Sequence, residues 1–228
     1  MTIRTPSQGR RFKPAIVGVI ASRDDLRRAV RMRKPPDLFE LRLDHFFKAL
    51  DELEKKLSML RAPLILTARD WREGGANHLS IGKRRELFFR FLHHASYIDV
   101  ELRAAASFRS LLRAAKKNVL RIISFHDLKS TPDSGRLQAI ASQAKIAGAD
   151  IFKVATRIDT PDQLSRLLDF ARTRNVALPI AAMGIGKLGA ASRIALAQRG
   201  SILNYASVGR ATIEGQLSIK QLRAALRR

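Results

Sequence analysis

The sequence contains no cysteine. Disulfide bonds, thiolate nucleophiles and cysteine-ligated metal sites are therefore excluded, since each needs a Cys side chain. A chain without disulfides is compatible with a reducing compartment, and we expect a cytoplasmic protein.

Long hydrophobic runs are also missing. No apolar run approaches the roughly 20 residues that a membrane-spanning helix needs. The apolar segment 15–21 follows Arg10, Arg11 and Lys13 and so mimics a short signal peptide, but no convincing small-residue cleavage site follows it. We interpret this segment as a first β-strand and expect no membrane partner.

Aromatic and acidic residues are scarce. The chain has one Trp and two Tyr, and 20 acidic residues stand against 43 basic ones, which gives a formal net charge of +23. Such a charge favours anionic partners, but nucleic-acid sites need aromatic platforms for stacking, which this chain barely supplies. The basic residues, Arg84 and Arg85 among them, are spread over nearly every expected helix. We therefore expect a solvated cationic surface that attracts a small anionic substrate, and no specific nucleic-acid binding.

The chain does contain a regular alternation of short apolar runs and longer amphipathic stretches. The apolar runs are the expected strands, at 15–20, 38–43, 63–69, 97–102, 119–125, 150–155, 178–183 and 202–207. Expected helices lie between them, for example at 47–60 and 137–144, and a last helix covers 218–226. Thr160 and Pro161 suit the N-cap and the first position of another helix.

Eight strand and helix units in 228 residues predict a single-domain (β/α)8 TIM barrel over residues 14–228. A doubly wound open sheet is the alternative. It usually has a glycine-rich turn after its first strand, whereas segment 21–24 has no glycine. Segment 184–189 has dinucleotide-loop spacing, but one match after the seventh strand is weak support. The basic segment 1–13 is expected to be a poorly ordered tail.

One lysine, Lys153, lies inside the apolar run 150–155. An ammonium group there loses hydration, so it needs charged partners or must give up its proton and become a nucleophilic amine. The preceding strand is followed by His126. Neighbouring strands lie about 4.8 Å apart, so we place both side chains together at the C-terminal strand ends, where barrel active sites lie. Each has a structural interpretation alone, but the pair predicts catalysis.

Other charged side chains fall near the expected strand ends. They are Glu40, Arg42, Asp44, Arg69, Glu73, Asp99 and Glu101, and Met183 ends the seventh strand. Alternate residues share one face of a strand, so Glu40 and Arg42 point into the barrel. Inward charges must pair with one another or bind a polar ligand. For Asp44 and Asp99, structural pairing is an equally good interpretation.

A lysine beside a histidine suits carbonyl chemistry. The amine condenses with a ketone to an iminium that acidifies the adjacent C–H, and imidazole transfers protons near neutral pH. Such a site can run an aldol cleavage or eliminate water. Arg42, Arg69 and Arg193 are suited to a substrate carboxylate or hydroxyls. The adjacent His93 and His94 lack the spacing of metal ligands, so no metal site is expected.

A series of segments between about residues 15 and 220 resembles the type I 3-dehydroquinate dehydratases. They are Glu40-Leu41-Arg42-Leu43-Asp44, Thr67-Ala68-Arg69 with Glu73-Gly74-Gly75, Asp99-Val100-Glu101-Leu102, Ser124-Phe125-His126-Asp127, Asp150-Ile151-Phe152-Lys153-Val154-Ala155, Met183-Gly184-Ile185-Gly186 with Ser192-Arg193, and Gly215-Gln216. The resemblance implies a cofactor-free (β/α)8 barrel, usually a homodimer. It also implies the syn elimination of water from 3-dehydroquinate, giving 3-dehydroshikimate, in the shikimate pathway of aromatic amino-acid biosynthesis.

The resemblance also implies residue roles. Lys153 matches the Schiff-base lysine, His126 the general acid/base, and Glu73 the carboxylate that positions this histidine and substrate hydroxyls. The matching substrate-binding positions are Glu40, Arg42, Arg69, Met183, Arg193, Thr212 and Gln216. Arg193 is the expected carboxylate clamp.

Two departures from the family pattern stand out. The closing loop 212–216 reads Thr-Ile-Glu-Gly-Gln where the family commonly has Ser-Ala-Pro-Gly-Gln. It keeps a hydroxyl and the glutamine, but it loses the proline and gains the charge of Glu214. Both changes bear on the stiffness of the lid. Ile185 stands where a second methionine is frequent, a change of similar volume.

Two alternative functions remain at the level of the sequence. A class I aldolase shares the barrel and the lysine, although a glycine nest for a phosphate is missing from the region after strands seven and eight. A nucleic-acid-binding or assembly protein on an inactive barrel would account for the +23 charge.

Overall fold

The computed structural model describes residues 14–48, 50–115, 118–172 and 176–226, so the expected tail 1–13 lies outside the described residues. The strands are β1 (Ala15–Ile20), β2 (Leu38–Arg42), β3 (Leu64–Thr67), β4 (Ala95–Glu101), β5 (Leu120–Asp127), β6 (Ile151–Arg157), β7 (Ile180–Ile185) and β8 (Leu203–Ser207). All eight strands expected from the apolar runs are confirmed. Each pairs in parallel with its sequence neighbour from β1 to β7, and β1 also pairs with β8.

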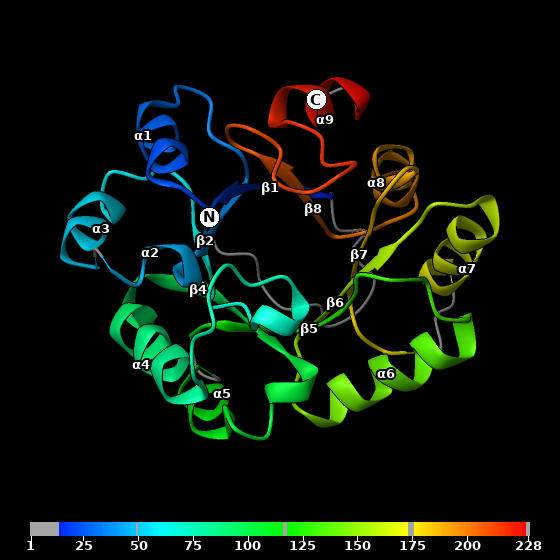
Figure 1. Ribbon diagram of the computed structural model, residues 1–228, viewed down its shortest axis with the longest axis horizontal. Helices are drawn as coiled ribbons and strands as arrows, with labels where there is room; N and C mark the ends of the chain where they lie inside the picture. The colour runs from blue at the N-terminus through cyan, green and yellow to red at the C-terminus, as the bar shows by residue number, and fades with distance from the viewer. Residues whose placement is uncertain (1–13, 49, 116–117, 173–175, 227–228) are drawn as a thin grey trace.

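Helices alternate with the strands and surround them (Figure 1). The α-helices are α1 (Arg23–Arg31), α2 (Leu43–Phe46), α3 (Leu50–Leu57), α4 (Ile81–Phe91), α5 (Arg109–Ala115), α6 (Ser134–Ile146), α7 (Pro161–Arg172), α8 (Gly189–Gln198) and α9 (Ile219–Ala225). Short 3-10 turns are η1 (Trp71–Glu73), η2 (Leu92–His94) and η3 (Leu102–Ala104). Within the described ranges, no helix is long and apolar enough to cross a membrane.

The start of α7 confirms the expected cap. Thr160 Oγ1 accepts a hydrogen bond from Gln163 N (3.4 Å), and Gln163 Oε1 accepts one from Thr160 N (3.2 Å). These reciprocal bonds satisfy donors that a helix end leaves free.

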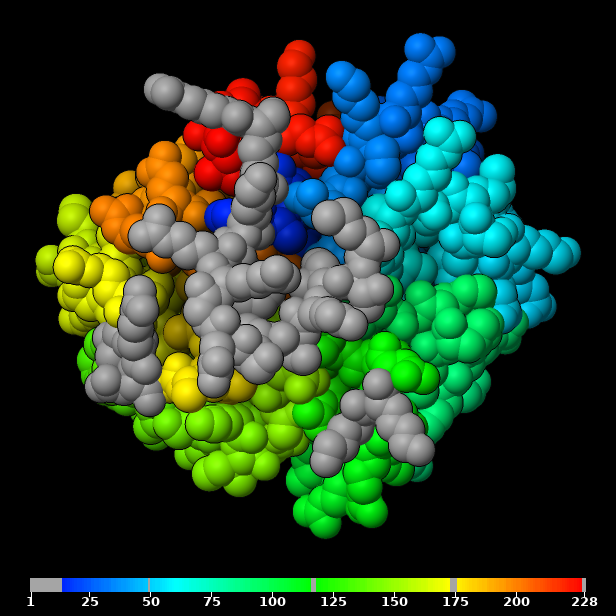
Figure 2. Space-filling view, turned by 180° about the vertical axis from the view of Figure 1, so that it is seen from behind, coloured from blue at the N-terminus to red at the C-terminus, as the bar shows by residue number. Residues whose placement is uncertain are grey.

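The sheet curves round until β7 and β8 meet. Ile202 N donates to Ile180 O (3.0 Å), and Ser201 Oγ accepts from Ala182 N (3.0 Å) and donates to Ala182 O (3.1 Å). In the view from behind, segments of successive colour follow one another around the rim (Figure 2). This closure excludes the doubly wound open sheet and confirms the single-domain (β/α)8 barrel.

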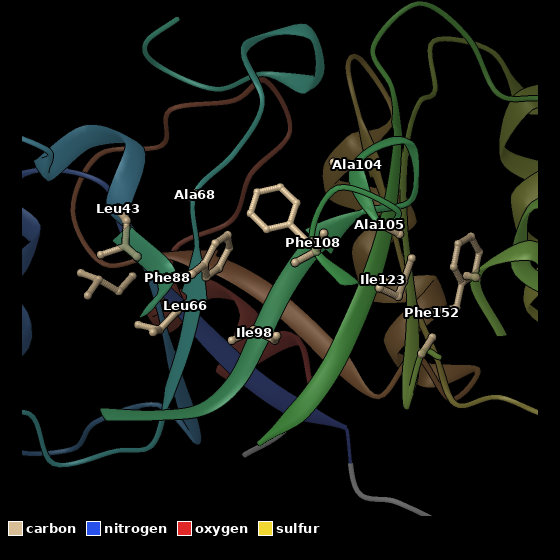
Figure 3. Packing of buried hydrophobic residues seen from close by; sticks show 14 of the residues in the cluster. Leu43, Leu66, Ala68, Phe88, Ile98, Ala104, Ala105, Phe108, Ile123 and Phe152 are labelled. Carbon is tan, nitrogen blue, oxygen red and sulfur yellow. The ribbon is translucent and has the colours of Figure 1, made fainter. Parts of the chain in front are cut away.

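Two apolar layers hold the barrel. The larger one lies between strands and helices, where Figure 3 shows Phe88, Phe108 and Ile123 among its members. The rings of Phe88 and Phe108 pack edge to face, with centroids 5.6 Å apart. A second, separate cluster fills the inside of the barrel, with Tyr97 and Tyr205 among its members.

Arg84 corrects the expectation that the helix cations lie on a solvated surface. Its side chain is only 1% exposed. The guanidinium donates from Nε to Ala68 O (2.6 Å) and from Nη1 to Asp70 Oδ2 (3.2 Å), and it pairs through Nη2 with Glu101. Its plane also lies over the Phe108 ring, 5.2 Å from the centroid. Arg84 therefore ties α4 to the top of β3 and β4 instead of facing water.

We expect Arg84→Ala to lower the free energy of unfolding by about 3–5 kcal/mol, because the buried carboxylates of Asp70 and Glu101 each lose a charge partner and Glu101 keeps only Arg69. Urea denaturation measures the change. The neighbouring exposed residue provides the matched control, since Arg85→Ala is expected to stay within about 0.5 kcal/mol of wild type. Equal effects of the two substitutions would contradict the structural role of Arg84.

Candidate active site

The interior of the barrel changes from apolar to polar along the strands. The lower, apolar members are Leu38, Ile65, Tyr97, Ile122 and Ile151. Two residues further along the same strands come Glu40, Thr67, Asp99, Ser124 and Lys153, all buried. Because alternate residues share a face, these five side chains point inward together. We call them the polar layer.

Lys153 is the cation at the centre of the polar layer. Its Nζ donates to Asp99 Oδ2 (2.8 Å) and to Glu40 Oε1 (3.3 Å), and it lies 4.1 Å from the centroid of the Tyr205 ring. The side chain is 5% exposed. Two carboxylates and an aromatic face therefore compensate the hydration that the ammonium loses.

The expected position of Lys153 at a strand end is wrong. It is the third residue of β6 and pairs with Ser124, while His126 pairs with Ala155. The strand continues because residues 155–157 also pair with β7. Lys153 therefore lies one inward-facing position deeper than His126, at the base of the site, and His126 lies near the end of β5 as expected.

Asp99 is the anion that most of the polar layer shares. Besides Lys153, its carboxylate accepts from Arg69 Nη2 (2.9 Å) and Ser124 Oγ (2.6 Å). Burial alone raises the pKa of Asp99, but the charges of Arg69 and Lys153 outweigh burial and hold that pKa well below its ordinary range. Arg69 also donates to Glu101 Oε1 (3.1 Å). The guanidinium of Arg69 is thus held by strand carboxylates inside the barrel.

Glu73 reaches His126 through a tight turn after β3. Gly74 has φ +87°, and a Cβ on Gly75 would lie 2.3 Å from Arg69 O, so both glycines are required by the path of the chain. The turn brings Glu73 Oε2 to 2.8 Å from His126 Nδ1 and 3.2 Å from His126 N. This contact fixes the imidazole through Nδ1 and leaves Nε2 as the ring nitrogen for proton transfer.

Burial sets the protonation of this pair. It raises the pKa of Glu73 to about 7, against the nearby charge of Arg69. Burial also lowers the pKa of His126 well below its ordinary value, and the charges of Arg69 and Lys153 lower it further. At neutral pH the imidazole is therefore uncharged and able to act as a base.

Arg193, on α8, is a buried cation without a carboxylate partner among the described residues. It is 4% exposed, its Nη1 donates to Tyr205 O (2.9 Å), and its Nε has no hydrogen-bond partner in the part of the chain that the structure describes. Burial lowers the pKa of Arg193 to about 10. The Arg193 guanidinium therefore stays charged at neutral pH, and no carboxylate of the described residues neutralises it. An anionic group of a ligand can bind beside it.

Arg42 differs from Arg193 because it already has a carboxylate. Its Nε and Nη2 donate to the two oxygens of Asp44 (3.0 and 2.7 Å), and Nη2 also donates to Gly74 O (3.1 Å). Asp44 further accepts from the backbone N–H groups of Arg69 and Ala76 (3.2 and 3.0 Å). The structural interpretation of Asp44 is therefore confirmed, and this pair anchors the turn that carries Glu73.

One pocket over the polar layer brings the expected site residues together. Its empty volume is ≈ 640 Å³, including solvent at its mouth. All ten expected residues line it, namely Glu40, Arg42, Arg69, Glu73, His126, Lys153, Met183, Arg193, Thr212 and Gln216. A site of this kind holds an electrophilic ketone near an amine, a base and a free guanidinium.

The sequence matches one enzyme family over nearly its whole length. Residues 17–228 match the family model of Type I 3-dehydroquinase. A 3-dehydroquinate dehydratase of Thermococcus onnurineus is 30% identical over 215 residues, which cover 92% of this chain and 96% of that protein. The chain belongs to the type I 3-dehydroquinase family.

Solved structures of the type I 3-dehydroquinase family have the same fold. The 3-dehydroquinate dehydratase of Geobacillus kaustophilus has a TM-score of 0.85 and 30% identity, and the match covers 94% of this chain and 90% of that one. The type I enzyme of Clostridium difficile with covalently modified comenic acid has a TM-score of 0.83 and 25% identity, covering 95% and 92%. The family confirms the resemblance seen in the sequence and favours the dehydratase over the aldolase alternative.

The lid loop of this family member is restrained by a charge pair. Glu214 Oε2 lies 3.3 Å from Arg157 Nη2, and its backbone O accepts from Gly186 N (3.2 Å). Gln216 Oε1 accepts from Thr212 N (3.1 Å). The added charge of Glu214 thus pairs with Arg157 at the end of β6. This pair restrains a loop that lacks the family's common proline. Ile185, the second departure, lines the pocket wall.

Three residues that contribute to the site were not singled out in the sequence. Tyr205 lies under Lys153, Ser124 bonds Asp99, and Arg84 pairs with Glu101. Strand alternation contains the information for two of them, because Tyr205 and Ser124 each follow an interior apolar residue by two. The helical pattern also contains a signal for Arg84, because it lies three, four and seven residues before Leu87, Phe88 and Phe91 and so on the buried face of α4, which the exposed Arg85 does not.

We expect Glu73→Gln to change how stability depends on pH. Because the pKa of Glu73 is raised from 4.5 to about 7, its contribution to folding is complete below the lower value and is lost as pH rises through the upper one. Relative to wild type, the variant therefore gains free energy of unfolding between these pH values, by up to about 3 kcal/mol. The lowered pKa of His126 acts in the opposite direction in both proteins, and to first order it cancels in the difference.

Urea denaturation in steps from acidic to neutral pH measures this difference. The exposed Glu86→Gln is the matched control and is expected to stay within about 0.5 kcal/mol of wild type throughout. Parallel stability curves for wild type and Glu73→Gln would contradict the raised pKa.

Proposed function

We propose that this chain is a 3-dehydroquinate dehydratase, a hydro-lyase that converts 3-dehydroquinate to 3-dehydroshikimate through an imine on Lys153. The observation that carries the proposal is Lys153 itself, a buried amine at the base of a pocket. The pocket is also lined by a base and by a guanidinium that has no carboxylate partner among the described residues. Membership of the type I 3-dehydroquinase family supports the substrate and the Schiff-base chemistry.

The chemistry begins when the ammonium of Lys153 gives up one proton to His126 and the resulting amine attacks the ketone carbon, and His126 returns this proton to the carbinolamine oxygen. Water leaves and an iminium forms, which withdraws electrons from the neighbouring carbon and acidifies its C–H. His126 takes this proton through Nε2, the ring nitrogen that Glu73 does not engage. The β-hydroxyl accepts this proton from His126 and leaves as water, and hydrolysis of the iminium releases the product and restores the amine.

Asp99 and Glu40 serve the amine in its charged states. Both carboxylates contact Nζ, so they orient the lysine before attack and stabilise the iminium that follows. Because they are fixed by Arg69 and Thr67, little reorganisation is needed when the charge changes form. This preorganisation is what a catalytic lysine needs in a low-dielectric site.

The walls of the pocket bind the rest of the substrate in this proposal. Arg193 binds the carboxylate, because it alone among the lining arginines has no carboxylate partner within the described residues. Arg42, Thr212 and Gln216 lie around the mouth and offer polar groups to the substrate hydroxyls. The apolar wall of Met183 and neighbouring residues favours a carbocyclic ring.

The polar layer argues against a nucleic-acid-binding or assembly protein on an inactive barrel. Its charges cost desolvation energy, and a barrel that no longer needed them would be more stable with apolar residues at those positions. The expected homodimer, the cytoplasmic location and the absence of a cofactor stay predictions.

Borohydride reduction in the presence of dehydroquinate tests the imine. We expect a covalent adduct on Lys153, because borohydride reduces an iminium to a stable amine, and we expect Lys153→Ala to form no adduct and to lose turnover. Lys187→Ala, which changes an exposed lysine in the loop after β7, is the control and should be labelled like wild type. Peptide mapping that finds the label on another residue would contradict the mechanism.

Substitution of Arg193 tests the carboxylate site. We expect Arg193→Met to lower kcat/KM by about 10- to 200-fold, since a charge-assisted hydrogen bond contributes about 1.5–3 kcal/mol. Its stability should be unchanged or higher, because an uncompensated buried charge is removed. Arg199→Met, at the exposed end of α8, controls for general loss of charge. Unchanged kcat/KM in Arg193→Met would assign the carboxylate to another residue.

A further inference from the structure

Two histidines and a glutamate meet on the outside of the barrel, far from the C-terminal strand ends that form the pocket. Glu54 comes from α3, and His93 and His94 come from η2, directly before β4. Glu54 Oε1 lies 3.8 Å from His93 Nε2 and 3.9 Å from His94 Nε2. All three atoms lie within 4.8 Å of one another.

These contacts are too long to be hydrogen bonds. Moreover, His94 Nε2 is buried and has no hydrogen-bond partner among the described residues. The other oxygen of Glu54 is occupied, since Oε2 accepts from Arg90 Nη2 (3.0 Å) and Nε (3.3 Å). Three lone-pair donors therefore lie within 4.8 Å of one another without a hydrogen bond between them.

We propose that Glu54, His93 and His94 bind a divalent transition-metal cation of the Zn²⁺ class. Two imidazoles and one carboxylate are a donor set that such cations accept, with water as a fourth ligand. Ligand distances of about 2.0–2.2 Å need each histidine nitrogen to move only about half an ångström closer to Glu54 Oε1. His93 is 62% exposed, so its side chain has room to make that adjustment.

The surroundings hold the carboxylate in place. Arg90 orients Glu54 from behind and also pairs with Asp51 of the same helix.

A cation at this position would tie α3 to η2 at the start of β4, two segments about forty residues apart in the sequence. Its effect is therefore expected on stability and not on turnover. This site is not predictable from the sequence, because the adjacent histidines lack ligand spacing and Glu54 comes from a separate helix.

The test uses the full chain, freed of metal by a chelator, and titrates it with ZnCl₂ by calorimetry and with CoCl₂ by visible absorption. We expect one equivalent bound and a higher Tm with Zn²⁺ present. His93→Ala and His94→Ala should each weaken binding by at least about tenfold. His78→Ala, which removes an exposed histidine from another loop, is the matched control and should bind like wild type.

Three results would overturn the proposal. They are the absence of saturable binding, equal binding in wild type and His93→Ala, and loss of binding in His78→Ala in place of the two η2 variants. His93 is largely exposed, so its substitution leaves the fold available for measurement, and circular dichroism checks this. Dehydratase activity measured with and without Zn²⁺ is independent of the outcome, since the site does not touch the pocket.

Discussion

The buried ammonium of Lys153 is the constraint on which the rest of the barrel interior depends. A cation in that position requires Asp99 and Glu40 as counter-charges, and Asp99 in turn requires Arg69 and Ser124. Each added charge needs a further partner, so the network grows outward until Arg84 of the helical ring completes it at Glu101. The same network of ion pairs therefore connects the active site to the helices that surround the barrel.

The fold was largely predictable from the sequence, because each strand is a short apolar run and each helix has its own periodicity. The eight strands were located and only their ends differed, since pairing with a neighbour decides where a strand stops. Lys153 shows this: its apolar run was expected to end near it, but pairing with β7 extends the strand to Arg157. How deep a residue lies within the barrel depends on the register between paired strands, and a single sequence does not specify that register.

The residues that line the pocket were also predictable, but the sequence did not show which of their charges are neutralised by a partner. Arg42, Arg69 and Arg193 are equivalent in the sequence, but only Arg193 lacks a carboxylate partner among the described residues. Likewise Arg84 and Arg85 are neighbours on one helix, and only Arg84 is buried. Which cation is neutralised depends on contacts between distant segments, and those contacts exist only in the folded chain.

The apolar layer beneath the polar layer has a consequence for the route of the ligand. Leu38, Ile65, Ile122 and Ile151 are buried below Lys153 and close the barrel from that side. Among the described residues, the pocket therefore opens toward the C-terminal strand ends, beside Thr212 and Gln216. The ion pair of Arg157 and Glu214 lies in the loop beside this opening, so it is placed to affect the release of product as well as the entry of substrate.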